Sequence, residues 1–302
     1  MPGFISHHLF GHEIYLTITD KDVANSIRKF KNVYNLGLQG PDIFYYNIGS
    51  YLKIGKNPGN SEHHQKTDEF LLNLARSASL FDSREDYECA MSYLAGFYAH
   101  YTLDKICHPF IFARTYYKFK DDKNYLGLHY QYETDIDALY LKRSLGIVPS
   151  EFKADRNITI SFDEAQIVNK ILLNAHSKTY GKLSIKKNEA ERAAYSMKKI
   201  LPLLSDPHGI KKFILGGIEK AIFGSPYLSA MITSDYEIRF KGAENLSHEN
   251  WKSPWEPDKV RHESFYELKD LAITDYQRLM PLLSALMRHE AEITEATAEH
   301  FH

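Results

Sequence analysis

The spacing of apolar residues along the chain is that of α-helices. Apolar side chains recur every three or four positions, as at Phe70, Leu71, Leu74 and Ala78, and this period places them on one face of a helix. No Asn-Gly or Asp-Gly pair separates alternating, strand-like segments, so no β-hairpin is predicted. The pattern predicts an all-α fold with helices over residues 20–30, 67–80, 83–107, 128–145, 162–180, 188–204 and 263–290.

Glycine and proline mark the expected interruptions between these helices. Gly37, Gly40 and Pro41 predict a loop over residues 31–42. Pro109 should end the long helix before it, because the residue preceding a proline avoids the helical region. Further loops are expected over residues 53–61 and 245–257.

The chain of 302 residues has a globular composition, with 43% hydrophobic and 25% charged residues. No internal repeat, low-complexity tract or flexible linker divides it. We therefore predict a single multi-helix domain over residues 1–302. Its ligand-type residues lie in 1–145, and the helices of 146–302 complete the fold.

Charge and cysteine content narrow the class of protein. The formal net charge is −2, from 37 basic and 39 acidic residues, which is not the basic pattern of a nucleic-acid-binding protein. The two cysteines, Cys89 and Cys107, lie 18 residues apart in one predicted helix and cannot pair there. The N-terminus lacks a basic segment followed by an apolar one, so a cytoplasmic location is expected.

Histidine is the informative residue type, because eight of the 15 histidines lie in the first 129 residues. His100, Asp104 and His108 follow one another at intervals of four, so they project from one helical face at successive turns. We place His108 at the end of its helix. Polar groups in so apolar a helix need a partner, because burial without one is costly.

A second run with the same spacing begins at His129 and continues through Glu133 to Asp137. One such pair could be an exposed i,i+4 contact, but two of them favour a site with more than one metal ion. Imidazole and carboxylate ligands suit zinc. Asp137 either faces solvent or orients His129 or a neighbouring ligand.

Further ligands are expected from three segments outside these two helices. Asp42 lies in a turn after Gly40 and Pro41, where a carboxylate can reach inward. The histidine pair at 63–64 offers either His63 or His64, and the Lys66-Thr67 spacing favours His63. The N-terminal segment similarly offers His7 or His8, of which we assign His7.

These residues and their flanking strings resemble the bacterial zinc-dependent phospholipase C family, which shares an all-helical fold with the S1/P1-type zinc nucleases. The ligand pattern consists of His7, Asp42, His63, His100, Asp104, His108, His129 and Glu133. The flanking strings are SHHLFG at 6–11, LQGPDIFYY at 38–46 and HxxKT at 63–67.

The resemblance implies how the ions are held. One zinc ion would be bound by Asp42, His63, His100 and Asp104, a second by His108, His129 and Glu133, and a third by His7 with Asp104. Asp42 would also be the catalytic general base, or would orient the attacking water. The secreted members complete the third site with the amino group of an N-terminal tryptophan, whereas this chain begins Met1-Pro2, so two or three ions are expected. The gap from Asp104 to His108 is also shorter than in those enzymes.

The expected activity is phospholipase C-type hydrolysis of a phosphodiester by a metal-bound hydroxide, with a phospholipid or small phosphate ester as substrate. Transient contact with a membrane surface is also expected, although no strongly amphipathic basic helix stands out. An S1/P1-like zinc nuclease or phosphatase is the alternative on the same scaffold, and the near-neutral charge speaks against nucleic acid. A non-catalytic, metal-stabilised binding protein is the alternative from another class. The sequence assigns no oligomeric state.

Overall fold

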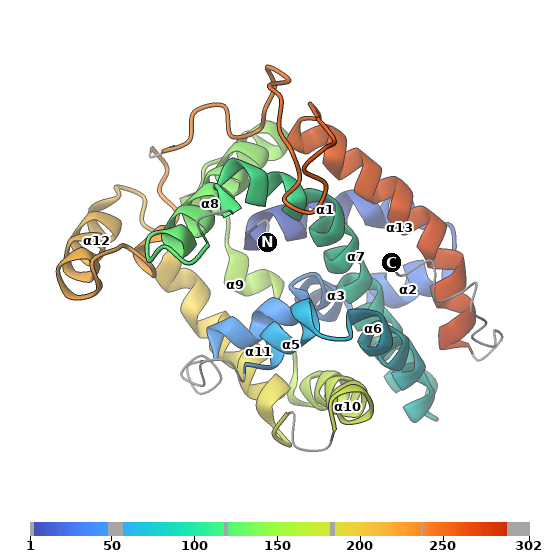
Figure 1. Ribbon diagram of the computed structural model, residues 1–302. Coiled ribbons are helices and arrows are strands. Elements are labelled where there is room, and N and C mark those ends of the chain that lie inside the picture. The colour runs from blue at the N-terminus through green and yellow to red at the C-terminus, as the bar shows by residue number, and fades with distance from the viewer. Residues whose placement is uncertain (1–2, 48–56, 118–119, 182–184, 237, 289–302) are drawn as a thin grey trace. The chain divides into compact units, whose positions relative to one another are not determined.

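The computed structural model describes residues 3–47, 57–117, 120–181, 185–236 and 238–288 (Figure 1). Within these ranges the chain forms α-helices and short 3-10 helices and no β-strand. Backbone pairing of the strand kind is limited there to two isolated bridges, Ser205 with Thr233 and Trp251 with Arg261. The all-α prediction is therefore confirmed.

Each of the seven segments predicted to be helical contains a helix. The α-helices are α1 (Phe4–Tyr15), α2 (Lys21–Lys29), α3 (Lys31–Gly37), α5 (Pro58–His64), α6 (Thr67–Arg76), α7 (Arg84–Arg114), α8 (Tyr125–Leu145), α9 (Ala154–Asn157), α10 (Phe162–Thr179), α11 (Glu189–Ile200), α12 (Ile210–Phe223) and α13 (Phe265–Met287). The 3-10 helices are η1 (Gly40–Tyr46), η2 (Ser77–Leu80), η4 (Pro149–Glu151), η5 (Leu201–Leu204) and η6 (Ser229–Met231). None of the described helices is both long and apolar enough to cross a bilayer.

The prediction that Pro109 ends the long helix is wrong, since α7 continues to Arg114. Proline removes one backbone hydrogen bond from a helix interior. The turn beyond it is held by packing, because Phe110 and Ile111 are fully buried and the Phe110 ring meets the Trp251 ring at 5.3 Å. His108 therefore lies inside a continuous helix and not at a helix end.

The loop predicted over residues 31–42 is also wrong, because α3 occupies Lys31–Gly37 and η1 begins at Gly40. The glycine at 37 serves close packing. A Cβ there would lie 2.2 Å from the carbonyl oxygen of Tyr93 on α7. Burial of Val33, Leu36 and their neighbours stabilises this short helix, and tertiary packing of that kind routinely overrides local propensity.

The chain divides into two compact, interleaved units. Unit 1 comprises residues 1–10, 101–154 and 201–274, and unit 2 comprises 11–100, 155–200 and 275–302. Helices α1, α7 and α13 each contribute residues to both units. The single domain over 1–302 stays a prediction.

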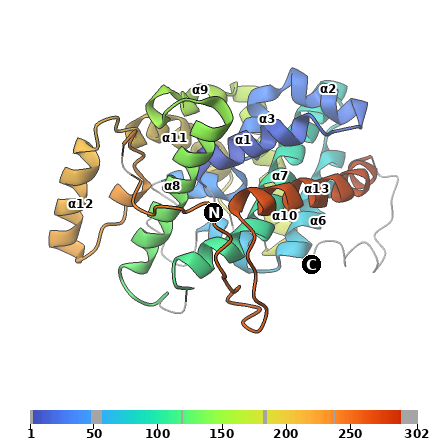
Figure 2. The same cartoon turned by 90° about the horizontal axis from the view of Figure 1, so that it is seen from above.

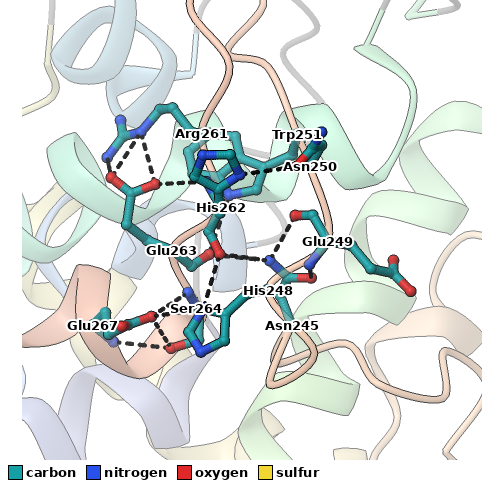
Figure 3. A network of polar contacts seen from close by, with 10 residues as sticks. All are labelled: Asn245, His248, Glu249, Asn250, Trp251, Arg261, His262, Glu263, Ser264 and Glu267. Atoms are coloured by element: carbon teal, nitrogen blue, oxygen red, sulfur yellow. Dashed lines mark hydrogen bonds and ion pairs between the residues drawn. The ribbon is translucent and has the colours of Figure 1, made fainter.

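In unit 1 a long connection leads from η6 to α13, and its second half is tied together by side chains (Figure 3). The Asn245 amide donates to the carbonyl oxygens of Glu249, His262 and Glu263, at 3.0 to 3.2 Å. The indole Nε1 of Trp251 donates to the same Glu263 oxygen at 3.1 Å. The predicted loop over 245–257 is thus a packed segment with a buried tryptophan.

Unit 2 is built around buried aromatic side chains. Phe70 of α6 packs against Phe97 of α7, with ring centroids 6.0 Å apart, and against His176 of α10 at 5.3 Å. The Tyr276 hydroxyl of α13 donates to the carbonyl oxygen of Ala95. These contacts fix the part of α7 that ends at His100.

Candidate metal centre

Two helices of unit 1 present ligand-type side chains at one-turn intervals. Helix α7 carries Asp104 and His108, and α8 carries His129 and Glu133. Three of these four residues are buried, and His108 is half-buried. The Nε2 atom of His129 lies 2.8 Å from Oε1 of Glu133, and Nε2 of His108 lies 3.7 Å from the same oxygen.

The hydrogen bonds around His129 indicate which of its ring nitrogens carries the proton. The hydroxyl of Thr115 donates to the carbonyl oxygen of Ile111 at 2.7 Å, so its oxygen can accept from Nδ1 of His129, 3.5 Å away. The lone pair of His129 is then on Nε2 and faces a carboxylate oxygen. Two acceptor atoms 2.8 Å apart repel unless a cation or a proton lies between them.

The donor set around this point fits a zinc ion. The ligand atoms of His108, His129 and Glu133 all lie within 4.8 Å of one another. The buried Nε2 of His108 makes no hydrogen bond with any residue in the described ranges. Two imidazoles and one carboxylate are the three protein ligands of many catalytic zinc sites, in which a fourth position stays open for water or substrate.

His7 extends this cluster within unit 1. It is fully buried in the first turns of α1, and its Nε2 lies 3.3 Å from Oδ1 of Asp104. The neighbouring His8 ring instead packs edge-on against Phe152, with centroids 5.1 Å apart. His7 is therefore the histidine of this pair that faces a carboxylate.

Asp137 fixes the N-terminus of the helix that carries His7. Its carboxylate accepts hydrogen bonds from the backbone N–H groups of Ile5 and Ser6 at 3.0 and 2.8 Å, and from the Ser6 hydroxyl at 2.6 Å. These are N–H groups that the first turn of a helix leaves without intrahelical partners. Burial raises the pKa of Asp137 to about 7, while the donors from Ser6 and Ile5 act in the opposite direction. Asp137 is buried, so it does not face solvent; it holds the segment next to His7.

Unit 2 gathers the other three expected ligands. Asp42 lies in η1, His63 in α5 and His100 in α7. The Nε2 atom of His63 lies 3.6 Å from Oδ1 of Asp42, and the rings of His63 and His100 are 6.1 Å apart at their centroids. The side chain of His64, the alternative to His63, lies outside the described part of the structure.

Backbone carbonyl groups orient both imidazoles of this second cluster. Nδ1 of His63 lies 2.8 Å from the oxygen of Gly59, and Nδ1 of His100 lies 3.1 Å from the oxygen of Leu38. A carbonyl oxygen can only accept, so Nδ1 carries the proton in each ring and the lone pair is on Nε2. This is the arrangement by which metal-binding histidines are held in proteins.

Local sequence features build the segments that carry Asp42 and His63. The Asn57 side chain caps α5 by accepting from Gly59 N at 2.9 Å, and its amide donates to the oxygen of Phe44 in η1 at 3.2 Å. Gly40 has a φ of +48°, and a Cβ there would lie 2.5 Å from Cδ2 of His100. Glycine at this position therefore allows η1 to approach the imidazole.

Sequence reasoning missed a buried pair behind His63. The Glu62 carboxylate lies within hydrogen-bond distance of Nε2 of His176, and both side chains are fully buried in unit 2. The pair ties α5 to α10. The only signal in the sequence is a polar residue on an otherwise apolar helical face at His176, which by itself indicates no particular partner.

The pKa shifts of Glu133 and Cys107 distinguish a side chain that can bind zinc from one that cannot. Burial acts to raise the pKa of Glu133, but its interactions with neighbouring groups, His129 among them, bring it below the usual value, so the carboxylate form is favoured. Both cysteines are free and buried, and burial raises the pKa of Cys107 far above its ordinary range. A protonated thiol is a poor zinc ligand, which agrees with a site made of imidazoles and carboxylates.

Comparison with known proteins gives one match. A family model described as zinc dependent phospholipase C matches residues 6–190, which is more than half of the chain and includes all eight expected ligands. No curated protein and no solved structure matches the chain significantly. The family match agrees with the arrangement of histidines and carboxylates in each unit. On this evidence the chain belongs to the zinc-dependent phospholipase C family.

Proposed function

We propose that the chain is a zinc-dependent phosphoric ester hydrolase that cleaves a phosphodiester bond of a phospholipid in the manner of a phospholipase C. The observation that carries the proposal is the convergence of His108 Nε2, His129 Nε2 and Glu133 Oε1, two of them acceptor atoms 2.8 Å apart. Family membership supplies the substrate class.

The same proposal assigns the remaining ligands. Helix α7 carries His100 and Asp104 four positions apart, so both side chains project from one face of the helix. We assign one ion to Asp42, His63, His100 and Asp104, a second to His108, His129 and Glu133, and a third, where present, to His7 with Asp104. His7 then depends on Asp137 for its position.

When bound, the zinc ions would lower the pKa of a water molecule and stabilise negative charge on the phosphate oxygens. The protein side chains hold the reacting groups in place. His63, His100 and His129 are oriented through Nδ1, as described above. We assign to Asp42 the role of accepting a proton from the attacking water, or of orienting it. The new bond joins that oxygen to phosphorus, and the bond from phosphorus to the glycerol oxygen breaks, with a proton passing to the leaving alkoxide.

The test combines metal content with substrate choice. We expect protein purified without chelator, or supplied with zinc, to hold two or three zinc ions per chain by mass spectrometry. It should hydrolyse phosphatidylcholine and a chromogenic phosphocholine ester in preference to single-stranded nucleic acid. Faster hydrolysis of nucleic acid would favour the S1/P1-type nuclease. Zinc that raises heat stability without any hydrolysis would favour the binding protein, and no zinc uptake at all would refute the proposal.

A further inference from the structure

Helix α12 in unit 1 has its apolar side chains on the outside. Ile210, Phe213, Ile214, Ile218, Ile222 and Phe223 are all at least half exposed. Two of the charged residues of the same helix, Lys212 and Glu219, are buried at 7% and 3% exposure. A surface helix of a globular protein shows the reverse arrangement, with its apolar face toward the core. Figures 1 and 2 show this helix at the edge of unit 1, set apart from α8 in both views.

Polar contacts hold α12 in this orientation. The Glu219 carboxylate accepts from the backbone N–H groups of Tyr227, Leu228 and Ser229 at 2.7 to 3.0 Å. The Asp206 carboxylate accepts from the backbone N–H of Lys212 at 2.7 Å, in the first turn of the helix. The inner face of α12 is therefore attached to unit 1 by hydrogen bonds, which leaves the apolar face turned outward.

The charges that remain on the outer side of α12 are positive. Lys211 and Lys220 are exposed, whereas the acidic residue of the helix is the buried Glu219. The two lysines are nine positions apart, which places them about 180° from each other around the helix. Ile210 and Ala221 lie about midway between them. The Lys211 ammonium donates to the carbonyl oxygens of Leu203 and Ser205. The exposed Lys220 beside an apolar stripe suits an interface in which an ammonium group reaches a phosphate while the apolar side chains enter the acyl region.

The length of α12 determines whether it can span a bilayer or only lie along its surface. A helix of 14 residues is about 21 Å long, and about 20 residues are needed to span the hydrocarbon core. Helix α12 is thus too short to cross the bilayer but suited to lie along it. Leu203 and Leu228, whose backbone groups contact Lys211 and Glu219, add exposed apolar surface beside it.

We propose that α12 is the surface through which this protein docks on a phospholipid bilayer that contains anionic lipid. The docking rests on the proposed function in one respect, because a phospholipid hydrolase finds its substrate in a bilayer. Docking through α12 does not need a strongly amphipathic basic helix, because this short helix carries its apolar side chains toward solvent, and that orientation is set by the contacts of Asp206 and Glu219.

The test measures cosedimentation of the full chain with vesicles of phosphatidylcholine and phosphatidylserine. The double variant Phe213→Ser/Ile222→Ser removes two side chains that are 83% and 68% exposed. We expect its binding to vesicles to be about tenfold weaker or more, because each apolar side chain adds to interfacial affinity. The control Leu16→Ser/Phe162→Ser removes side chains that are 83% and 61% exposed elsewhere on the chain, and it should bind as the unchanged protein does.

Two further arms separate docking from catalysis and from self-association. The Lys220→Gln variant should bind mixed vesicles about fivefold more weakly but bind pure phosphatidylcholine vesicles unchanged, as expected for one lysine near an anionic leaflet. The His129→Ala variant should keep full vesicle binding and lose hydrolysis, so that failure of the catalytic proposal leaves docking intact. The docking proposal is overturned if the double variant binds vesicles as strongly as the unchanged protein does. It is also overturned if the unchanged protein does not bind vesicles and the double substitution only converts a dimer to a monomer in sedimentation.

Discussion

The two ligand clusters rest on elements of very different length. In unit 1, Asp104, His108, His129 and Glu133 lie on helices of 31 and 21 residues. In unit 2, His100 lies on α7 as well, but Asp42 and His63 lie on helices of only seven residues each. A seven-residue helix is not stable by itself in water. The second cluster therefore depends on the Asn57 cap, a glycine with positive φ and the buried Glu62–His176 pair, whereas the first depends mainly on helical periodicity.

This difference explains why helical spacing in the sequence indicates the first cluster but does not bring together Asp42 and His63 of the second. Residues four apart on a long helix share a face wherever the helix lies. Asp42 and His63 are 21 positions apart and meet through tertiary contacts between η1 and α5, which include the hydrogen bonds of the Asn57 side chain and that from the Tyr45 hydroxyl to Asn60. A ligand cluster built on short segments is thus a property of tertiary contacts, and substitutions should affect the two clusters differently.

The largest effect is expected from removing one imidazole of each cluster. His129→Ala in unit 1 and His63→Ala in unit 2 should each reduce phosphodiester hydrolysis by roughly a thousandfold or more, because lost metal ligands remove charge stabilisation in the transition state. Each variant should also retain about one zinc ion fewer per chain by mass spectrometry. His208→Ala, an exposed histidine outside both clusters, is the control and should change neither quantity. Normal hydrolysis by either cluster variant would show that the ligand assignment is wrong.

Metal removal should distinguish the clusters by their local stability. After chelation, amide hydrogen exchange in α5 should become about tenfold faster or more, while exchange in the interior of α8 should change by less than about threefold. The physical reason is the length of the elements, since α8 keeps its own hydrogen bonds and buried contacts. Equal acceleration in the two helices would contradict the comparison drawn above.

Asp137 should matter for the stability of unit 1. Asp137→Ala leaves the N–H groups of Ile5 and Ser6 and the Ser6 hydroxyl without their acceptor, and each lost hydrogen bond costs about 1 kcal/mol. We expect the free energy of unfolding to fall by about 3 kcal/mol in urea denaturation. Asp137→Asn, which keeps one acceptor oxygen, should lose about half as much.

The same residue gives a pH dependence with a defined sign. The pKa of Asp137 is about 7 in the folded chain and about 4 when unfolded, so the folded state binds the proton more tightly. Its contribution to stability is full below about pH 4 and is lost as the pH rises through 7. In chelator, the stability of the unchanged protein relative to Asp137→Asn should therefore decrease from pH 5 to pH 8. An increase over that range would contradict the assigned pKa.

The smallest effect is expected from a glycine substitution in unit 2. Gly40→Ala combines a positive φ with a Cβ 2.5 Å from the His100 ring, and should cost about 2 kcal/mol together with some zinc affinity. Gly146→Ala is a matched control, because Gly146 has a φ of +70° but no atom within 4 Å of the added Cβ. It should cost about 1 kcal/mol and leave zinc binding unchanged. Equal effects of the two variants on zinc binding would show that His100 tolerates the added methyl group.

Errors in predicting the fold occurred where packing outweighs local preference. Pro109 and the glycine at 37 were expected to interrupt helices, yet both lie in helices. Buried Phe110 and Ile111 hold the turn after Pro109, and Gly37 allows α3 to approach Tyr93 closely. Glycine and proline in the sequence indicate only a local backbone preference. Whether such a residue ends a helix or lies within it at a close helix–helix contact depends on packing against the neighbouring helix.

The pattern of the sequence alone determined that this chain is helical and that α7 and α8 carry imidazole and carboxylate groups on successive turns, because helical periodicity is a local property. Only the tertiary structure decided that Asp137 caps the helix of His7, that His63 faces Asp42, and that α12 turns its apolar face outward. These three features depend on contacts between residues distant in sequence, or on which side of a helix faces the core. The spacing of residues along one segment encodes neither kind of information.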